Sequence, residues 1–469
     1  MINFTCKPDV YLNDLMELVR AFEQRTDDAV SLDVVYARSG GELTVLLFSD
    51  RYDGFRKTYR YPVTAELPSE IKRLEKRYLK MAIYNTLVFL TGVNLPYGCL
   101  TGIRPTKLYT ELGADARRMF AEDFSVAPKK LELIERTVRA QTGLRNTEEG
   151  AFDVFVFIPF CPTKCAYCSF VSLPIDRRRN LIEPYTECLT KELRYIRSLA
   201  EGKGLKVRSV YVGGGTPTVL PPHLLDKILA ECDYGGTEFT VEAGRPDTVT
   251  EDVLRVLKNR GVTRVSVNPQ TFNDKTLEII GRRHKAEDVE RAYLMARAYG
   301  FDVNMDLIAM LPGEKFDDFR RTLDRAAEMS PENVTVHTLY LKRGSSLKTE
   351  GYRSTDNDEA ERMVDYAYRA LTEAGYNPYY MYRQKYTSGN LENAGYAKTG
   401  KECLYNIDIM EEDTSVLAAG AAAISKKLTR RINLIERNAN YKEPLEYVKH
   451  FDTVMERQRN FWENLPYYG

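Results

Sequence analysis

The pattern of hydrophobic and polar positions along the chain changes near residue 150. Beyond it, short and nearly continuous apolar runs rich in β-branched and aromatic residues alternate with longer amphipathic segments. The apolar runs, which predict strands, are 154–158, 207–215, 237–243, 262–268, 301–310 and 333–341. The segments that predict helices are 183–200, 221–231, 248–260, 285–299 and 315–329. Apolar strands separated by helices are typical of a parallel sheet with both faces covered.

Six βα units favour a partial or full (β/α) barrel over an open Rossmann sheet. We therefore expect an α/β fold in which residues 149–345 form a partial (β/α) barrel. In both architectures the chemistry lies at the carboxyl ends of the strands. A cysteine-rich stretch follows the first predicted strand, and the sequence "GGGTP" follows the second.

Different patterns flank the predicted barrel. Residues 1–148 predict an N-terminal α+β domain, with two strands in 31–49 around a Ser39-Gly40-Gly41 turn and a long helix over 68–90. A glycine-containing loop that leads into another helix is expected in 95–113, and a linker in 140–153.

Beyond residue 345 the alternation of strands and helices fades. Residues 346–469 predict a C-terminal helical or mixed subdomain. Its expected parts are a helix over 356–375, a tyrosine-rich polar segment over 376–397, an apolar run of small residues over 416–425 and a helical tail.

Composition and charge exclude some classes of protein. Lysine plus arginine equals aspartate plus glutamate at 67 each, which argues against a chain built to coat nucleic acid or an anionic membrane. The start has no basic segment followed by an apolar one, and the apolar stretch 83–93 is too short to span a bilayer. We expect a cytoplasmic protein with no membrane span and no nucleic-acid partner.

Three of the eight cysteines are tightly clustered. Cys161, Cys165 and Cys168 follow the first predicted strand at the spacing C-x3-C-x2-C, with no fourth cysteine nearby. A structural zinc site needs a fourth ligand, and none of the four histidines forms a suitable pair. A catalytic zinc with three thiolates remains open, whereas a redox dithiol would leave Cys161 unexplained.

An iron–sulfur cluster accounts for all three thiols. A [4Fe–4S] cube is normally held by four thiolates, so three protein ligands would leave one iron with an open coordination site. An open site lets a metal bind and activate a small molecule directly.

The C-x3-C-x2-C spacing, with Tyr167 before the third cysteine, resembles the signature of the radical S-adenosylmethionine (radical SAM) enzymes. The resemblance implies a barrel of the radical SAM type and two cofactors, a [4Fe–4S] cluster and S-adenosyl-L-methionine. In that family Cys161, Cys165 and Cys168 would hold the cluster, and S-adenosylmethionine would chelate the unique iron. The reduced cluster then cleaves the sulfonium and releases a 5′-deoxyadenosyl radical.

Further motifs extend the resemblance to cofactor-contacting positions. The stretch 211–220 is similar to the glycine motif of the family, which implies contacts of Gly213, Gly214, Gly215 and Thr216 with the methionine part of the cofactor. The other implied cofactor contacts are Glu242, Gln270, Arg282 and Asp306, which follow successive predicted strands. A carboxylate suits ribose hydroxyls, and an arginine suits a carboxylate.

These positions resemble one subgroup, the oxygen-independent coproporphyrinogen III oxidase (dehydrogenase) family, in its longer branch with an extra N-terminal domain that contains "LTGIRPTK" (100–107). The resemblance implies a radical SAM oxidoreductase of haem biosynthesis that decarboxylates coproporphyrinogen III to protoporphyrinogen IX. It implies a tetrapyrrole substrate and a reducing electron donor of the flavodoxin or ferredoxin type. No catalytic side chain can be assigned.

The chain departs from the family pattern at several positions. Phe170 stands where the well-studied oxidases have a further cysteine, and Phe155 and Phe157 stand at their tyrosine and histidine positions. The H-N-x-x-Y-W motif of a haem-chaperone branch is absent, and the only tryptophan is Trp462. Neither branch therefore matches cleanly. The alternatives are a haem-binding chaperone-like paralogue, against which the missing motif weighs, and a radical SAM enzyme that acts on haem or another tetrapyrrole.

A substrate with several carboxylates would need cations near the barrel mouth. The candidates are Arg104, Lys342, Arg343, Arg383 and Lys385, each of which could equally be a solvated surface residue. A flat macrocycle could stack on Tyr379, Tyr380, Tyr382 and Tyr386, although such a group more often packs in a core. The basic stretch 176–180 is expected to be exposed, which leaves a role in partner docking open.

Overall fold

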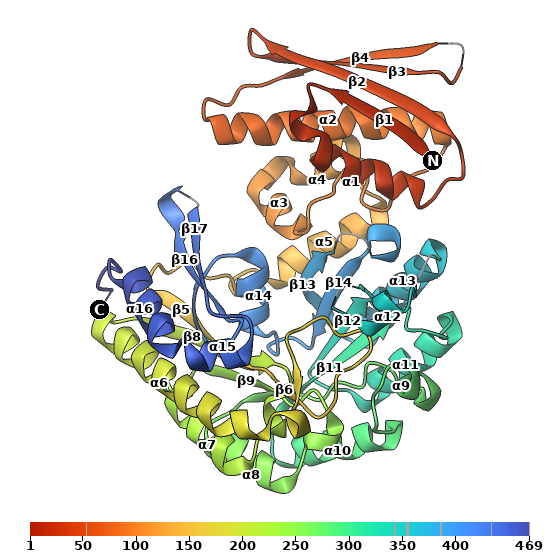
Figure 1. Cartoon of the computed structure of the whole chain (residues 1–469). Coiled ribbons are helices and arrows are strands. Elements are labelled where there is room, and N and C mark those ends of the chain that lie inside the picture. Colours follow the sequence, from red (N-terminus) through yellow and green to blue (C-terminus); the bar gives the residue numbers. More distant parts are fainter. Residues whose placement is uncertain (53, 342–343, 353–355, 385–386, 433, 469) are drawn as a thin grey trace. The chain divides into compact units, whose positions relative to one another are not determined.

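The computed structural model describes residues 1–52, 54–341, 344–352, 356–384, 387–432 and 434–468. The chain divides into two compact units. Unit 1 comprises Met1–Val138, Thr355–Glu361 and Met381–Glu392, and unit 2 comprises Arg139–Ser354, Arg362–Tyr380 and Asn393–Gly469. Figure 1 labels the helices and strands of both units.

Unit 1 is built on a four-stranded sheet in the order β1-β2-β3-β4. Its strands are β1 (Ile2–Lys7), β2 (Val30–Ser39), β3 (Glu42–Ser49) and β4 (Phe55–Pro62). Gly40 and Gly41 both have positive φ and form the predicted turn between β2 and β3. Two helices, α1 (Leu12–Glu23) and α2 (Pro68–Thr91), pack on one face of the sheet (Figure 1). The predicted hairpin and long helix are therefore confirmed.

Further helices begin in unit 1. They are α3 (Pro105–Leu112), α4 (Ala116–Arg118) and α5 (Pro128–Ala140). Lys130 on α5 forms a buried ion pair with Glu392, whose carboxylate lies 2.8 Å from the ammonium.

Unit 2 is organised around the predicted parallel strands. They are β5 (Ala151–Ile158), β8 (Lys206–Gly214), β9 (Glu238–Glu242), β10 (Arg264–Ser266), β11 (Asp302–Ala309) and β12 (Asn333–Thr338). Each pairs in parallel with the next, in the order in which they occur in the sequence. Because the strands run in parallel, their carboxyl ends meet at one edge of the sheet.

Helices connect the successive strands of unit 2. They are α6 (Arg179–Lys203), α7 (Pro222–Leu229), α8 (Glu251–Asn259), α10 (Ala286–Ala298) and α11 (Phe316–Met329), with a short additional helix α9 (Asp274–Ile279). They lie along the outer side of the strands (Figure 1). All five predicted helices of this region are confirmed.

The C-terminal part of the chain extends the same sheet, which the sequence did not predict. It adds β13 (Asn377–Arg383), β14 (Glu392–Ala397), β15 (Ser415–Ala419), β16 (Ile424–Thr429) and β17 (Leu434–Ala439). The small-residue strand β15 pairs in parallel with β5, and β14 pairs antiparallel with β12. The helices here are α12 (Ser346–Thr349), α13 (Asn357–Glu373), α14 (Leu404–Glu411), α15 (Pro444–Lys449) and α16 (Phe451–Trp462).

Within the described ranges, no helix of either unit combines 18 or more residues with enough hydrophobicity to cross a bilayer.

Candidate active site

The cysteine loop begins where β5 ends. Cys161 lies on the short strand β6 (Phe160–Cys161), which pairs with β7 (Leu173–Pro174). Cys165 and Cys168 lie in the loop between these two strands, where the Cys168 N–H donates to the Cys165 carbonyl oxygen over 3.1 Å. All three thiols are half-buried.

Hydrogen bonds from other strand ends fix this loop. The Ala166 N–H donates to the Ile280 carbonyl oxygen over 3.0 Å, and the Thr163 hydroxyl donates to the Gly281 carbonyl oxygen over 3.3 Å. Arg245 is 2% exposed and donates to the Thr163 hydroxyl oxygen over 2.9 Å. Asp247 holds the same guanidinium through two further bonds of 2.9 Å. The loop is thus tied to the ends of β9 and α9.

The glycine motif packs directly against the cysteine loop. A Cβ atom on Gly215 would lie 2.5 Å from the Phe160 carbonyl oxygen and 3.0 Å from the Cys161 sulfur. Thr216, which is 2% exposed, donates its hydroxyl to the Cys161 Sγ over 3.5 Å. Gly214 has a φ of 111°, and a Cβ atom there would lie 2.8 Å from the ring of Phe157. Only glycine fits this close approach.

Glu242 ends β9 beside the glycine motif. Its carboxylate accepts hydrogen bonds from the Tyr211 hydroxyl at 2.7 Å and from the Gly214 N–H at 3.3 Å. Burial raises the pKa of Glu242 to about 7; the Tyr211 bond opposes this rise, and the nearby charge of Asp306 adds to it. A Cβ atom on Gly213 would lie 2.8 Å from the carboxyl carbon, so this glycine leaves the room that the carboxylate occupies.

Gln270 follows β10 and lies beside Asp306, which is part of β11. The Gln270 N–H donates to the Asp306 carbonyl oxygen over 2.9 Å, and Gln270 adopts a φ of 66°. The Gln270 side-chain oxygen is buried and has no hydrogen-bond partner among the described residues. The Asp306 carboxylate accepts a 2.8 Å bond from Asn304, which in turn accepts from Thr335. A buried acceptor without a partner is a group that a ligand donor would satisfy.

Arg282 lies in the turn after α9. It is 5% exposed and donates to the carbonyl oxygens of Asn268 and Gly244, the latter over 3.0 Å. Burial alone would lower the pKa of Arg282, but Tyr167 and Cys165 beside it leave the pKa raised. Its Nε–H has no partner within the described part of the chain.

The predicted site residues therefore converge on one edge of the sheet. Each contacts another member of the set, or a residue that lies beside one. They lie in the loop after β5, at the ends of β8 and β9, after β10 and α9, and within β11. Burial raises the pKa of the Cys161 thiol to about 11, with the neighbouring thiols adding to the effect. Among the described residues, no three His, Cys, Asp or Glu side chains are close enough to hold one metal ion. A four-iron cube takes each thiolate on a different iron, so its ligands lie further apart than those of a single ion.

Two observations indicate that the side chains present fit a [4Fe–4S] cluster and S-adenosylmethionine. Three thiols on one loop match the ligand type of an iron–sulfur cluster. Beside them, a glycine-lined space and the buried unpartnered atoms of Gln270 and Arg282 match a small polar ligand.

Phenylalanines replace polar family residues and pack as hydrophobic residues. Phe157 is buried against Val416, Ala418 and Ala423 of the β15–β16 region. Phe155 stacks with Tyr405 at a ring separation of 5.9 Å. Phe170, in contrast, is 65% exposed on the cysteine loop.

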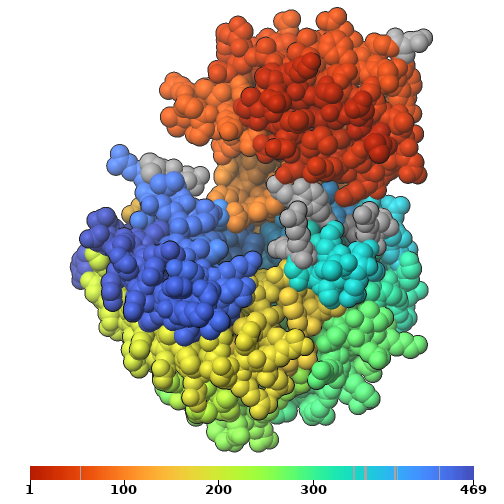
Figure 2. Space-filling view, in the orientation of Figure 1, coloured from red at the N-terminus to blue at the C-terminus, as the bar shows by residue number. Residues whose placement is uncertain are grey.

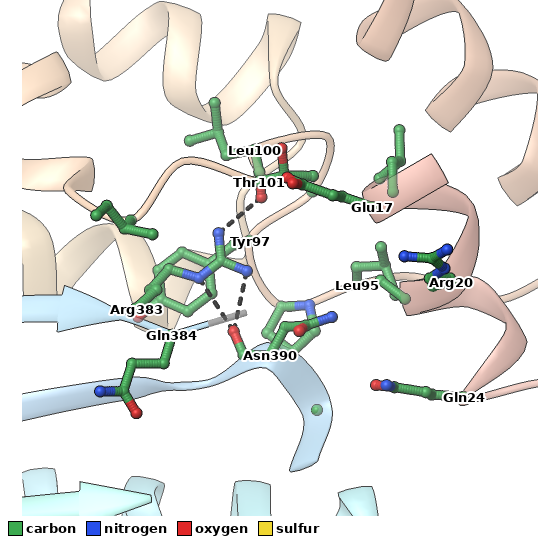
Figure 3. Close-up of a pocket in the computed structure, with 16 residues that line it drawn as sticks. Glu17, Arg20, Gln24, Leu95, Tyr97, Leu100, Thr101, Arg383, Gln384 and Asn390 are labelled. Carbon is green, nitrogen blue, oxygen red and sulfur yellow. Dashed lines mark hydrogen bonds between the residues drawn. The ribbon is translucent and has the colours of Figure 1, made fainter. Parts of the chain in front are cut away.

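Arg383 does not provide a cation for a substrate at the barrel. It belongs to unit 1, is 8% exposed, and lies over the ring of Tyr97 at 4.1 Å. Its guanidinium donates to the carbonyl oxygens of Leu100 at 2.6 Å and Asn390 at 2.9 Å (Figure 3). Carbonyl oxygens thus occupy the donors that we expected a substrate carboxylate to take. Arg104, another expected cation, also belongs to unit 1.

The tyrosines pack in the interior of the protein. Tyr379 is fully buried and accepts a 3.1 Å bond from Asn406, whereas Tyr380 donates to Thr335 over 3.3 Å. Tyr382 is partly buried on β13. The other expected side chains, Lys342, Arg343, Lys385 and Tyr386, lie outside the described residues.

Sequence reasoning missed three residues that position the site. Arg245 and Thr163 form the clamp on the cysteine loop, and Tyr211 holds Glu242. Tyr211 stands two residues before Gly213 on β8, so the alternation of faces along a strand could have indicated it. The pairing of Arg245 with Thr163 leaves no signal in the sequence, because 82 residues separate them.

Comparison with known proteins places this site in a family. The model of the radical SAM superfamily matches residues 155–326. The oxygen-independent coproporphyrinogen-III oxidase-like protein HemZ of Bacillus subtilis is 36% identical over 409 residues, which are 83% of this chain and 81% of HemZ. This chain belongs to the oxygen-independent coproporphyrinogen III oxidase-like family of radical SAM proteins.

Membership in this radical SAM family extends to its longer branch. The share aligned with HemZ is larger than residues 149–469 could supply alone, so it includes part of the N-terminal region. Radical SAM proteins use a [4Fe–4S] cluster and S-adenosylmethionine, and these are therefore the cofactors of this chain.

Further relatives of this radical SAM protein fall into two groups. The haem chaperone HemW of Haemophilus influenzae is 27% identical over 63% of this chain and 75% of its own length. The solved structure of coproporphyrinogen III oxidase HemN from Escherichia coli superposes with a TM-score of 0.52 at 23% identity. That superposition covers 67% of this chain and 72% of HemN, and it confirms the expected radical SAM α/β fold.

Proposed function

We propose that this protein catalyses the oxygen-independent oxidative decarboxylation of coproporphyrinogen III to protoporphyrinogen IX. The similarity to HemZ over most of both chains carries this proposal. The strand-end site supports it, because polar groups that suit a sulfonium nucleotide lie beside three thiols. In the reaction each of two propionates loses a hydrogen atom, carbon dioxide and one electron, which leaves a vinyl group.

Three thiolates, Cys161, Cys165 and Cys168, would hold the [4Fe–4S] cluster. When bound and reduced, the cluster and S-adenosylmethionine supply the 5′-deoxyadenosyl radical that abstracts hydrogen. Gly215 and Thr216 keep the cysteine loop close to the glycine motif, where backbone groups of Gly213 and Gly214 can approach the methionine part of the ligand.

Four further side chains would orient the nucleotide. Glu242, held by Tyr211, suits the ribose hydroxyls. Carbonyl oxygens occupy the terminal nitrogens of Arg282, so its unpartnered Nε–H would bind the methionine carboxylate. Gln270 presents its unpartnered buried oxygen, whereas Asp306 is held by Asn304. Because hydrogen bonds order these side chains before the ligand binds, they position the ligand at a lower entropic cost.

A haem-chaperone function is the second candidate. HemW proteins of several bacteria are similar to this chain, including that of Bacillus subtilis at 29% identity over 54% of the chain. The absence of the H-N-x-x-Y-W motif weighs against it.

Anaerobic product analysis separates the two functions. Reconstituted protein, a reductant and S-adenosylmethionine are mixed with coproporphyrinogen III in one arm and haem in another. We expect protoporphyrinogen IX and 5′-deoxyadenosine in the first arm, and neither product from the Cys165→Ala variant. Stoichiometric haem retention without decarboxylation would establish the chaperone instead. Cofactor cleavage with an unchanged tetrapyrrole would reject this substrate.

A further inference from the structure

An exposed basic surface adjoins the cysteine loop of unit 2. Lys164 within the loop and Arg177, Arg178 and Arg179 just after it are all exposed. We call these four residues and Phe170 the basic loop surface. Figure 2 shows the yellow segment that contains the loop at the surface of the viewed face.

The strand pairing keeps the arginines near the thiols. In the β6–β7 ladder Cys161 lies opposite Pro174, and paired strands lie about 4.8 Å apart. Arg177 follows Pro174 by three residues, and consecutive Cα atoms are 3.8 Å apart. The Cα atoms of Arg177 and Cys161 therefore lie within about 16 Å of each other. Phe170 is only two residues from Cys168, so its Cα lies within about 8 Å of that cysteine.

The charge of this surface departs from that of the whole chain, which is formally neutral. Asp176 is the only acidic residue between 162 and 180, and it pairs with Arg179 over 2.6 Å. Arg177 and Arg178 have no ion-pair partner among the described residues. The turn over 279–285 contains no acidic residue and is hydrogen-bonded to the cysteine loop. It adds two more exposed basic residues, Arg283 and Lys285.

Exposed apolar side chains accompany the charge. Phe170 on the cysteine loop is 65% exposed, and Ile279 at the start of the turn is 52% exposed. An apolar contact ringed by charges of one sign is typical of a docking site for a partner of the opposite sign.

We propose that the basic loop surface docks an acidic one-electron carrier protein that reduces the cluster. The inference rests on Cys161, Cys165 and Cys168 as the cluster ligands. One electron passes from the reduced carrier to the oxidised cluster, so the carrier leaves oxidised by one electron and no bond is formed. The arginines attract the carrier, and Phe170 brings the contact close to the thiolates.

The test measures the rate of cluster reduction, not turnover. Reconstituted protein is mixed anaerobically with reduced flavodoxin, a small acidic carrier, and the loss of cluster absorbance is followed at low and high ionic strength. The double variant Arg177→Gln/Arg178→Gln is compared with Arg320→Gln/Arg321→Gln on α11. Arg320 and Arg321 are also exposed, at 41% and 63% of their side chains, so both variants lose the same net charge.

We expect the rate at low ionic strength to fall about tenfold in the Arg177/Arg178 variant and to depend less on salt, as for electrostatically steered association. The Arg320/Arg321 variant should match the wild type. Phe170→Ser should slow reduction without changing its salt dependence. Photoreduced deazariboflavin, a small neutral reductant, should reduce all variants equally.

Equal rates with flavodoxin in all variants would overturn the docking surface. A rate that falls equally with deazariboflavin would also overturn it, because the substitutions would then act on the cluster itself. The assay contains no tetrapyrrole, so a failure of the proposed decarboxylation would leave its outcome unaffected. An acidic ferredoxin tested in parallel distinguishes the two carrier types.

Discussion

The Gly215→Ala substitution probes the contact on which the site depends. The added methyl carbon would lie 2.5 Å from the Phe160 carbonyl oxygen and 3.0 Å from both the Ile158 carbonyl oxygen and the Cys161 sulfur. The first distance is about 0.9 Å short of an ordinary carbon contact at 3.4 Å. The cysteine loop would have to move, because the obstructing atom is backbone.

Two hydrogen bonds oppose that movement. The Gly215 N–H donates to the Ile158 carbonyl oxygen and the Thr216 N–H to the Phe160 carbonyl oxygen, each over 2.7 Å. Overpacking costs about 1–3 kcal/mol and the two weakened bonds together add about 2 kcal/mol at most, which gives a loss on the order of 1–5 kcal/mol. Even 2 kcal/mol disfavours the native loop position about 30-fold.

The assay is iron and sulfide content per chain after anaerobic reconstitution, together with the melting temperature. We expect Gly215→Ala to lose most of its iron and to melt at a lower temperature. Gly202→Ala is the matched control, because it lies within α6 and its methyl would meet nothing within 4 Å. Gly213→Ala should fall between the two, since the nearest atoms to its methyl belong to the end of the Glu242 side chain and not to the backbone. Full iron content and wild-type melting in Gly215→Ala would refute the reasoning.

Three further predictions concern other parts of the molecule. Since burial raises the pKa of Glu242 from 4.5 to about 7, S-adenosylmethionine should bind about tenfold more tightly at pH 8, where the carboxylate is ionised, than at pH 6. Glu242→Gln should abolish this pH dependence in equilibrium binding. The contribution of protonated Glu242 to folding stability is complete below pH 4.5 and is lost as the pH rises through 7. Lys130→Met removes the cation that pairs with the buried Glu392 carboxylate and should destabilise unit 1 by about 3–5 kcal/mol in thermal unfolding. The double variant Lys130→Met/Glu392→Met should recover most of the loss. An unchanged melting temperature of the single variant would contradict this prediction. Cys165→Ala should assemble no intact cluster, whereas the half-buried Cys188 tolerates alanine; a brown Cys165→Ala protein with full iron would contradict the ligand assignment.

The central strand–helix alternation could be predicted because each strand carries its own apolar signal. Parallel pairing then required the carboxyl ends to meet, so motifs far apart in the sequence were expected to converge. The structure brings Cys161, Gly215 and Glu242 together in this way.

The C-terminal strands could not be predicted because their burial depends on tertiary contacts. All six residues of β14 are buried although Glu392 and Asn393 are polar, and the Asn393 oxygen accepts a 2.9 Å bond from the Thr338 N–H. Gly395 leaves room for the ring of Tyr380, whose nearest atom would lie 1.9 Å from an added Cβ. Local sequence patterns do not encode partners so far apart.

Electron paramagnetic resonance of the reduced, reconstituted protein, recorded with and without S-adenosylmethionine, tests the central assignment most directly. Three thiolates on one loop should give a [4Fe–4S] signal whose g-values shift when the ligand binds the open iron. A signal that S-adenosylmethionine leaves unchanged, or a protein that takes up a single tetrahedral zinc ion in place of iron, would contradict the account.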